Sequence, residues 1–416
     1  MSQTLAPAAI PAAIPAHVPA ELVFNLDVGG ARTEAFRKDP FKVWGKLRGL
    51  PPVFWSTHAE AIRPGGCWVA TGAEPIRQVM QDWEHFSNER ARDPNGGYSG
   101  GTGGLVPLYM DPPEHGKYRA LLAPVFSPKN IDAVEQSLTG LSSELIDAFA
   151  GKGECEFMTA YARPFPVIVF MRFMGLPMEG REQFIAWEHT IFQGETLEAR
   201  RAAAMAVAGY MRELSEEKRR NPGDDILSGL VRAEVDGAPI RPEMLAGMNM
   251  LLYMAGLDTV AAGLGHTLRY LAEHPKLQRR LRANPEMIPD AIEESLRYHS
   301  WIPTGRLCVK DIELNGAPIK AGDWVQTLLY AASNDPAEAP DPSQFRPDRE
   351  PNRHFAFGAG VHRCAGSHLA RREMRIAVRM LLDRLGEFRV KPGAELRYDG
   401  GLVCLNSLPL EWEVKA

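Results

Sequence analysis

The stretch HFAFGAGVHRCAGSHLARREMRIAV, residues 354–378, decides the fold. A glycine-punctuated loop leads into a segment in which apolar residues return every three or four positions, which predicts a helix over 367–385. Cys364 would lie at the start of this helix, where free N–H groups and the positive end of the helix dipole should lower the pKa of a thiol. Glycines at 358, 360 and 366 would let a flat, bulky group, such as a macrocycle, approach the backbone. The alternative is a buried free cysteine near a helix start.

Helical periodicity dominates the rest of the chain and recurs at roughly 131–150, 198–220, 242–273 and 287–299. Strand signals are fewer. Ile312 to Leu314, the dipeptide Asn315-Gly316 and a run around 324–329 predict a small hairpin region, and 67–71 predicts another strand. We therefore predict a protein that is mostly α with a minor β part.

Composition and charge exclude several classes of protein. The 416 residues are 45% hydrophobic and 24% charged, which is typical of a globular chain, and the net charge of −5 gives no general attraction for nucleic acid. The five cysteines form no C-x-x-C pair, so neither a disulfide framework nor a zinc site is indicated, and a reducing cytoplasm fits best. Four prolines, at 7, 11, 15 and 19, would break any membrane-spanning helix at the apolar N-terminus. We expect an N-terminal arm over 1–22, a single domain over 23–416, and no membrane.

The motif F-G-x-G-x-H-x-C-x-G, residues 357–366, resembles the haem-binding loop of the cytochrome P450 family. Ala-Gly-Leu-Asp-Thr, residues 255–259, is similar to the oxygen-activation motif of the family's distal helix. The segment 111–115, Asp-Pro-Pro-Glu-His, followed by Arg119, resembles the start of its propionate-binding helix. The nearest likeness is to bacterial camphor-hydroxylase-type members.

This resemblance implies a fold with haem b held between a proximal cysteine loop and a long distal helix, with Cys364 as the metal ligand. A thiolate ligand favours O–O cleavage, so oxygen activation is expected rather than oxygen storage. The cofactor-binding residues that the resemblance implies are His115, Arg119, Arg306, His354, Phe357, Gly358, Cys364 and Gly366.

Asp258 and Thr259 are the predicted catalytic residues, and the resemblance implies that they deliver protons during oxygen activation. They lie in an apolar run, where a charge is costly unless it is paired or used. Gly256 would make a local opening of the helix plausible. The alternative is an aspartate held in a salt bridge and a threonine bonded back to its own helix.

Glu294-Ser-Leu-Arg297 resembles the family's E-x-x-R pair, and Arg349 would complete a structural triad with it. The substrate should be small and apolar, because the residues expected around it are mostly apolar. Gly103 stands where camphor-type enzymes carry a tyrosine, which puts camphor in doubt and leaves a cyclic terpenoid as the expectation. The predicted pocket residues are Gly103, Leu105, Leu108, Leu251, Met254, Ala255, Ile302 and Val403.

Two electrons must come from outside the chain, because it carries neither a cysteine cluster for iron–sulfur nor a strand followed by G-x-G-x-x-G. A separate [2Fe–2S] ferredoxin with an NAD(P)H-dependent ferredoxin reductase is expected. Its docking patch would include Arg77, Arg119, Arg371 and Arg372, although the same residues could be plain solvated helix charges.

Several alternative functions compete with this interpretation. Residues 97–101 match the hydrolase pattern G-x-S-x-G, but no strand precedes them and no helix follows, so a hydrolase is rejected. The glycine-rich segment 96–104 is either a surface connection or a lid. A peroxide-driven peroxygenase, an isomerase and a non-catalytic haem sensor remain as alternatives to the monooxygenase.

Overall fold

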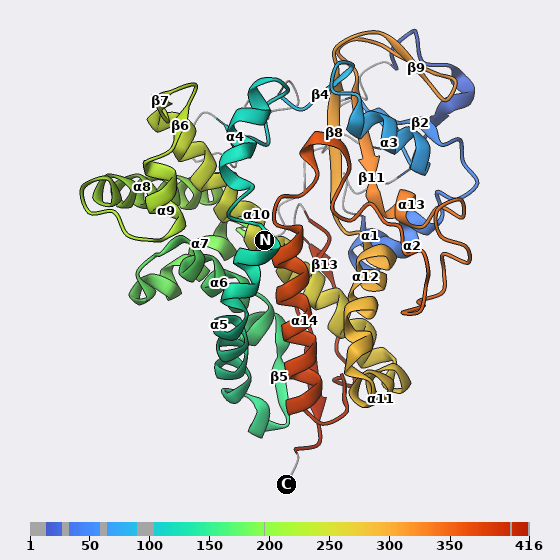
Figure 1. Ribbon diagram of the computed structural model, residues 1–416. Coiled ribbons are helices and arrows are strands. Elements are labelled where there is room, and N and C mark those ends of the chain that lie inside the picture. The colour runs from blue at the N-terminus through green and yellow to red at the C-terminus, as the bar shows by residue number, and fades with distance from the viewer. Residues whose placement is uncertain are drawn as a thin grey trace, which may run out of the picture.

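The computed structural model describes residues 14–26, 33–58, 65–89, 104–194, 196–399 and 402–414. Helices make up most of the molecule, and the largest sheet lies at one side of it (Figure 1). This confirms the expected fold class, mostly α with a minor β part. The helices are α1 (Glu34–Lys38), α2 (Pro40–Gly45), α3 (Ala73–Gln81), α4 (Glu114–Leu122), α5 (Pro128–Asp147), α6 (Pro164–Met174), α7 (Arg181–Gln193), α8 (Leu197–Arg220), α9 (Ile226–Val231), α10 (Pro242–Glu273), α11 (Pro275–Ala283), α12 (Ile288–His299), α13 (Leu329–Ser333) and α14 (Ser367–Arg384).

The predicted helices correspond to α5, α8, α10, α12 and α14. The 242–273 prediction matches α10 at both ends, while α5 begins three residues earlier than predicted, at Pro128. Proline is favoured in the first turn of a helix because its missing N–H would have no partner there. Periodicity therefore located these helices, and turn chemistry decides where they begin.

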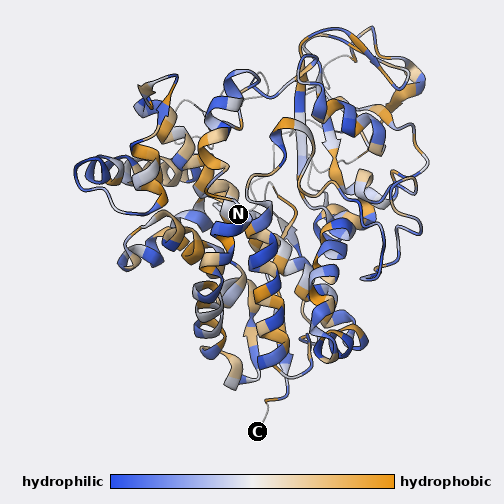
Figure 2. Cartoon of the chain, in the orientation of Figure 1, coloured by the Kyte–Doolittle hydropathy of each residue, from blue (hydrophilic) through white to orange (hydrophobic). Residues whose placement is uncertain are grey.

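The long helix α10 runs through the middle of the protein. By length and composition it could cross a membrane, but 61% of its apolar window is buried inside the protein, as in a core helix. It packs against α6, α8 and α14. Hydrophobic and hydrophilic residues alternate along α14 (Figure 2), so α14 can present one face to the core and another to a ligand.

The largest sheet has the strand order β1-β2-β3-β11-β8-β4. Its strands are β1 (Val23–Phe24), β2 (Val53–Ser56), β3 (Cys67–Ala70), β11 (Trp324–Leu328), β8 (Pro303–Cys308) and β4 (Phe86–Ser87). The strand predicted over 67–71 is β3. Smaller sheets pair β15 (Pro409–Trp412) with both β12 (Phe388–Val390) and β5 (Glu154–Glu156), β13 (Tyr398–Asp399) with β14 (Cys404–Leu405), and β6 (Glu234–Val235) with β7 (Ala238–Pro239).

The predicted hairpin is correct at its turn and wrong in its second strand. Asn315 and Gly316 both have positive φ, 49° and 80°, as a two-residue hairpin turn requires. The strands that they join are β9 (Ile312–Leu314) and β10 (Ala317–Ile319), whereas the run at 324–328 is β11 and pairs with β3 and β8. After a two-residue turn, the second strand of a hairpin must begin with the residues that follow the turn directly. The prediction chooses the more hydrophobic run further along the chain instead.

Part of the predicted N-terminal arm contacts the body. Val18 is buried, and His17 Nε2 lies 2.8 Å from Asp323 Oδ2. Residues 1–13 of the arm lie outside the described residues, as does 96–103 of the glycine-rich segment. The division into an arm and a single domain stays a prediction.

Candidate functional site

The loop before α14 turns tightly and packs against the end of α3. Gly358 and Gly360 have φ values of 68° and 69°, in the left-handed region that favours glycine. A Cβ on Gly360 would lie 2.4 Å from the carbonyl oxygen of Met80, closer than atoms tolerate. The Cys364 N–H donates to Phe357 O at 2.9 Å, so the loop is fixed by its own backbone as well as by α3.

The expected lowering of the Cys364 pKa is a prediction that the structure corrects. Burial raises the pKa of this thiol. The Gly366 N–H at the start of α14 acts in the expected direction, as do the guanidinium groups of Arg119, Arg363 and Arg371, but together they do not outweigh burial. The residue as a whole is nevertheless exposed, although neighbouring atoms crowd its thiol.

In α10, a residue in the middle of the core helix is left uncovered. Ala255 is exposed, and a Cβ on Gly256 would meet no atom within 4 Å. Thr259, half-buried one turn after Ala255, donates its hydroxyl to Ala255 O at 2.8 Å. The helix is continuous from Pro242 to Glu273, so the opening expected at Gly256 is not seen: each backbone group there keeps its helical geometry.

Asp258 lies on another side of α10 and is almost completely buried, with 1% of its surface exposed. Its Oδ1 has no hydrogen-bond partner, and it forms no ion pair with any described residue. Burial raises the pKa of this carboxyl to about 6, and the positive charge of Arg163 opposes the rise. The alternative to a catalytic pair is an aspartate in a salt bridge and a threonine bonded to its own helix. The structure shows this bond for Thr259 but no salt bridge for Asp258 with a described residue.

Four basic side chains gather beside the Cys364 loop: His115, Arg119, Arg306 and His362. The rings of His115 and His362 are 4.4 Å apart, and Arg306 is 5% exposed. Burial lowers the pKa of Arg306 to about 10 and that of His362 to about 3.

No carboxylate in the described part of the chain pairs with Arg119 or Arg306, which donate only to the carbonyl oxygens of Arg363 and Gly305. His362 Nε2 is buried and has no partner. Buried cations normally have anionic partners. The cluster therefore suits a group that brings its own carboxylates, as haem does with its two propionates, and the exposed Cys364 suits the iron.

His354 is predicted to bind the cofactor with these basic residues, and that role stays a prediction. Its Nε2 lies 3.1 Å from Glu293 Oε2, and the same carboxylate accepts two bonds from Arg371, at 2.6 and 2.8 Å. His362 is the histidine that lies beside His115. It is visible in the sequence as the histidine of the 357–366 motif, two residues before Cys364, and that position is the signal that could have identified it.

Phe357 and the predicted triad each make specific side-chain contacts. The Arg371 guanidinium lies 4.4 Å from the centre of the Phe357 ring. Glu294 accepts two bonds from Arg297, both at 2.8 Å, and two from Arg349, both at 3.2 Å. The structure thus brings the three predicted triad residues into one buried network.

The predicted substrate residues fall in two groups. Leu105 is buried in the hydrophobic cluster that also holds Leu257 of α10, with Leu108, Leu251 and Met254 packed against it. Val106 N–H donates to Gly247 O at 3.3 Å, which attaches this segment to α10. Ile302 and Val403 belong to a second cluster, and Val403 N–H donates to the neighbouring Trp301 O. Gly103 lies outside the described residues.

Comparison with known proteins agrees with this geometry. The cytochrome P450 family model matches residues 181–398. Probable cytochrome P450 127A1 from Sinorhizobium fredii is 38% identical over 365 residues, which cover 87% of this chain and 87% of that protein. Mycinamicin IV hydroxylase/epoxidase from Micromonospora griseorubida is 32% identical over 386 residues, which cover 89% and 94% of the two chains.

Solved structures show the same relationship in three dimensions. CYP101J2 is 34% identical with a TM-score of 0.85, over 97% of this chain and 100% of that one. Cytochrome P450 CYP101C1 is 29% identical with a TM-score of 0.87, over 96% and 100%. Both are camphor-hydroxylase-like, which confirms the predicted likeness to that subgroup. The chain belongs to the cytochrome P450 family of haem-thiolate monooxygenases, oxidoreductases in which a cysteine thiolate holds haem b.

Proposed function

We propose that this monooxygenase hydroxylates a small apolar substrate, a cyclic terpenoid in kind, with O2 and two electrons from a separate ferredoxin in the bacterial cytoplasm. The observation that carries the proposal is the uncovered part of α10, where Ala255 is exposed and Thr259 half-buried in an otherwise apolar helix, in a chain that also presents an exposed Cys364. The name of one relative, mycinamicin IV hydroxylase/epoxidase, indicates a different kind of substrate, so the terpenoid proposal rests on the pocket and on the likeness to CYP101J2 and CYP101C1.

Haem, when bound, supplies the iron at which oxygen is activated, and a thiolate ligand favours O–O cleavage. Cys364 would hold the iron. Arg119, Arg306, His115 and His362 would hold the two propionates by charge-assisted hydrogen bonds. Phe357 and Gly358 would shape the loop on the proximal side, since Phe357 stacks under Arg371 and Gly358 provides the turn.

Thr259 and Asp258 would divide the handling of protons between them. The Thr259 hydroxyl is held by a single bond to Ala255 O, and rotation of the side chain would release it to donate toward the haem side. Asp258 is buried with one oxygen unpartnered and a pKa raised by burial to about 6, so it can exchange a proton near neutral pH. Gly256 between Ala255 and Leu257 leaves open space in which water could bind.

The substrate would lie against an apolar wall. Leu105, Leu108, Leu251 and Met254 offer aliphatic surface on one side, and Ile302 and Val403 on the other, whereas polar contacts are few. The test is turnover with a panel of monocyclic and bicyclic terpenoids, NADH, a [2Fe–2S] ferredoxin and its reductase. We expect hydroxylated product with electrons from NADH. Product formed only when hydrogen peroxide replaces the redox proteins would instead identify a peroxygenase.

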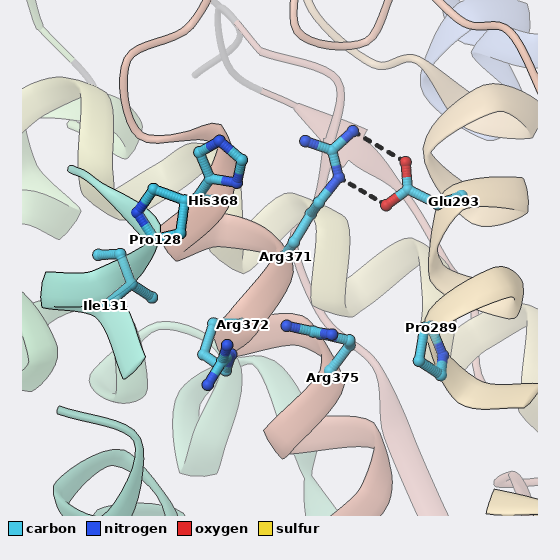
Figure 3. A pocket seen from close by; sticks show the side chains of 8 residues that line it. All are labelled: Pro128, Ile131, Pro289, Glu293, His368, Arg371, Arg372 and Arg375. Atoms are coloured by element: carbon cyan, nitrogen blue, oxygen red, sulfur yellow. Dashed lines mark hydrogen bonds and ion pairs between the residues drawn. The ribbon is translucent and has the colours of Figure 1, made fainter. Parts of the chain in front are cut away.

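For the ferredoxin, the structure offers a hollow of about 220 Å³ at the N-terminal part of α14. Figure 3 shows His368, Arg371, Arg372 and Arg375 around it, with Glu293 bonded to Arg371. Of the four arginines predicted for docking, Arg77 pairs with Glu74 and Glu338, and Arg119 lies with the basic residues beside the Cys364 loop. Only Arg371 and Arg372 line the hollow.

Arg375 is the arginine of this hollow with no ion pair among the described residues, since Arg371 is taken by Glu293 and Arg372 by Asp132 and Glu135. We therefore infer that Arg375 meets a carboxylate of the ferredoxin. Arg375→Glu should weaken ferredoxin binding by about threefold to tenfold at low salt, an effect that added salt should diminish. Arg212→Glu on α8, an exposed arginine away from the hollow, is the control, and equal binding by both variants would contradict this docking site.

A further inference from the structure

Glu188 is a buried carboxyl group that the proposed chemistry does not use. It lies on α7 with 1% of its surface exposed, and Asp258 on α10 and Arg163, the residue before α6, are buried with it at 1% and 6%. Glu188 senses the charges of Asp258 and Arg163, and Asp258 senses that of Arg163, yet no ion pair joins any of them within the described ranges. We call these three residues the Glu188 cluster.

The position of the cluster is fixed by contacts around it. One turn before Glu188 along α7, Phe184 O accepts a bond of 3.0 Å from Tyr253 OH, and Tyr253 lies on α10 five residues before Asp258. Arg163 donates through Nη2 to the carbonyl oxygens of Leu405 and Asn406, at 3.4 and 3.3 Å. The three side chains are therefore held at the junction of α6, α7, α10 and the paired strands β13 and β14.

Each member of the cluster has a buried polar atom without a hydrogen-bond partner: Arg163 Nε, Glu188 Oε2 and Asp258 Oδ1. Buried polar atoms in proteins are almost always satisfied, by ordered water where no protein group reaches them. Three such atoms in one interacting group can be satisfied together by shared water. They predict a hydrated link between the two carboxyl groups.

Two carboxyl groups face a single arginine, so both cannot easily be ionised at once. Burial raises the pKa of Glu188 to about 8, with repulsion from Asp258 adding to the rise and Arg163 opposing it. Burial raises the pKa of Asp258 to about 6. Near pH 7 the pair then holds one proton, mostly on Glu188.

The other ionisable groups that face the cluster are His189, Tyr253 and Cys404. Burial raises the pKa values of the Tyr253 hydroxyl and the Cys404 thiol, which stay neutral near pH 7. Burial lowers the pKa of His189, an exposed residue next to Glu188 that also senses Arg163. His189 is therefore the exposed member of these groups.

We propose that Glu188 and Asp258 share one proton through ordered water beside Arg163, and that Glu188 is the positioning residue that resupplies Asp258 during turnover. The inference rests on the proposed function, in which Asp258 and Thr259 deliver protons. In the step, the O–H bond of the Glu188 carboxyl breaks and an O–H bond forms on the Asp258 carboxylate. Glu188 becomes a carboxylate and regains its proton from solvent, and no electrons are transferred.

The first test needs no turnover. Infrared spectra of the resting haem-loaded enzyme at pH 7 should show the carbonyl band of a protonated carboxyl that shifts in D2O and is lost in Glu188→Gln. Glu373, whose pKa burial raises well above the ordinary value, contributes its own band, so the difference spectrum between wild type and Glu188→Gln is the measurement. Glu182→Gln, an exposed position on the same helix, is the control and should leave the spectrum unchanged.

Asp258→Asn supplies a second, directional result. Burial is the main cause of the raised Glu188 pKa and would remain, but removing the Asp258 charge removes the repulsion that adds to it, so the Glu188 band should titrate away at a lower pH than in wild type. An unchanged titration, or a wild-type spectrum that Glu188→Gln does not alter, would overturn the shared proton.

Turnover then tests the resupply of Asp258. Glu188→Gln should lower product per NADH by roughly tenfold, less than the 10²–10⁴ of a direct general acid, with a larger solvent isotope effect and an unchanged KM for substrate. Glu188→Asp, which keeps the carboxyl, should recover part of the loss, and Glu182→Gln should behave as wild type. If Glu188→Gln fails to fold, Glu188→Asp still decides through the infrared spectrum, because a protonated-carboxyl band that this variant leaves unshifted would not belong to Glu188 and would contradict the proposal.

The two proposals fail separately. If Asp258→Asn is fully coupled, the proton-delivery role in the proposed function is wrong. If Asp258→Asn is impaired while Glu188→Gln keeps wild-type coupling and pH profile, only the resupply by Glu188 is wrong.

Discussion

Two buried clusters in this enzyme contain the same kinds of charged side chain in opposite proportions. Around Glu294, one carboxylate meets two arginines, Arg297 and Arg349, and both of its oxygens accept hydrogen bonds from them. In the Glu188 cluster, two carboxyl groups meet one arginine, and each member keeps an unpartnered atom.

This difference indicates that the Glu294 network stabilises the structure, whereas the Glu188 cluster is suited to binding and releasing a proton. A fully satisfied buried network rigidifies the structure around it, because moving any member leaves a charge unpaired. A cluster with more acids than bases and unsatisfied atoms can instead take up and release a proton at little structural cost. The Glu294 network includes Arg349 and Asn352, which come shortly before the Cys364 loop in the chain, and the Glu188 cluster includes Asp258, next to Thr259, where the proposed function uses protons.

The largest expected effect comes from replacing Cys364, the residue that would bind the haem iron. Cys364→Ser should abolish the red-shifted Soret band that a thiolate-ligated haem shows when reduced with carbon monoxide, and with it all NADH-driven product formation. The reason is that a serine hydroxyl does not supply the electron density of a thiolate. The measurement is the reduced carbon monoxide spectrum, with circular dichroism as the control for folding. A variant that keeps the thiolate-type band would show that another residue holds the iron.

The next effect compares the two clusters directly by stability. Glu294→Gln removes the carboxylate shared by Arg297 and Arg349 and should lower the free energy of unfolding by about 3–5 kcal/mol. Glu188→Gln removes no hydrogen bond with a described residue, and burial disfavours the charged form of the carboxyl that it replaces. It should therefore not lower the free energy of unfolding at pH 7. Urea unfolding of the haem-loaded proteins at pH 7 measures both. If both variants lowered the free energy of unfolding equally, the two clusters would not differ in how much their carboxylates stabilise the protein.

Thr259→Ala should break the proton chain in front of the Glu188 cluster. NADH oxidation should continue while product falls by about tenfold and hydrogen peroxide rises, because the hydroxyl that delivers the proton is gone. Product per NADH and peroxide are the measurements. Thr267→Ala is a matched control, since Thr267 makes the same back-bond to its own helix at Gly263 O. Full coupling in Thr259→Ala would remove that hydroxyl from the proposed function.

The two clusters also differ in how visible they are in the sequence. Glu294 and Arg297 are one helical turn apart on α12, and the family pattern adds Arg349, so the network could be predicted. Arg163, Glu188 and Asp258 come from separate parts of the chain, with no spacing that connects them. Only packing brings them together, and in the sequence Glu188 is one carboxylate among many.

Within the site, the same limit applies to geometry. Periodicity located α10 and α14, and the glycine pattern located the Cys364 loop, because both signals are local. The net direction of the Cys364 pKa could not be predicted, since burial depends on atoms from distant segments. His354 and His362 show the same effect: both lie near Cys364 in the chain, and only the fold gives one to Glu293 and the other to His115.

The last effect is a pH dependence of stability that, of the two clusters, the Glu188 cluster should produce. The folded-state pKa of Glu188 is raised to about 8 from its ordinary 4.5, so the folded enzyme binds this proton more tightly than the unfolded chain. The resulting stability is complete below about pH 4.5 and is lost as pH rises toward 8.

Wild type should therefore lose stability relative to Glu188→Gln across this window, by at most about 1.4 kcal/mol per pH unit. The measurement is the free energy of unfolding of both proteins in urea at half-unit steps from pH 5 to pH 8. The difference between the two proteins cancels every titrating group that they share. Parallel curves would mean that Glu188 is ionised in the folded enzyme at neutral pH, and the distinction between a structural and a proton-holding cluster would then fail at its central residue.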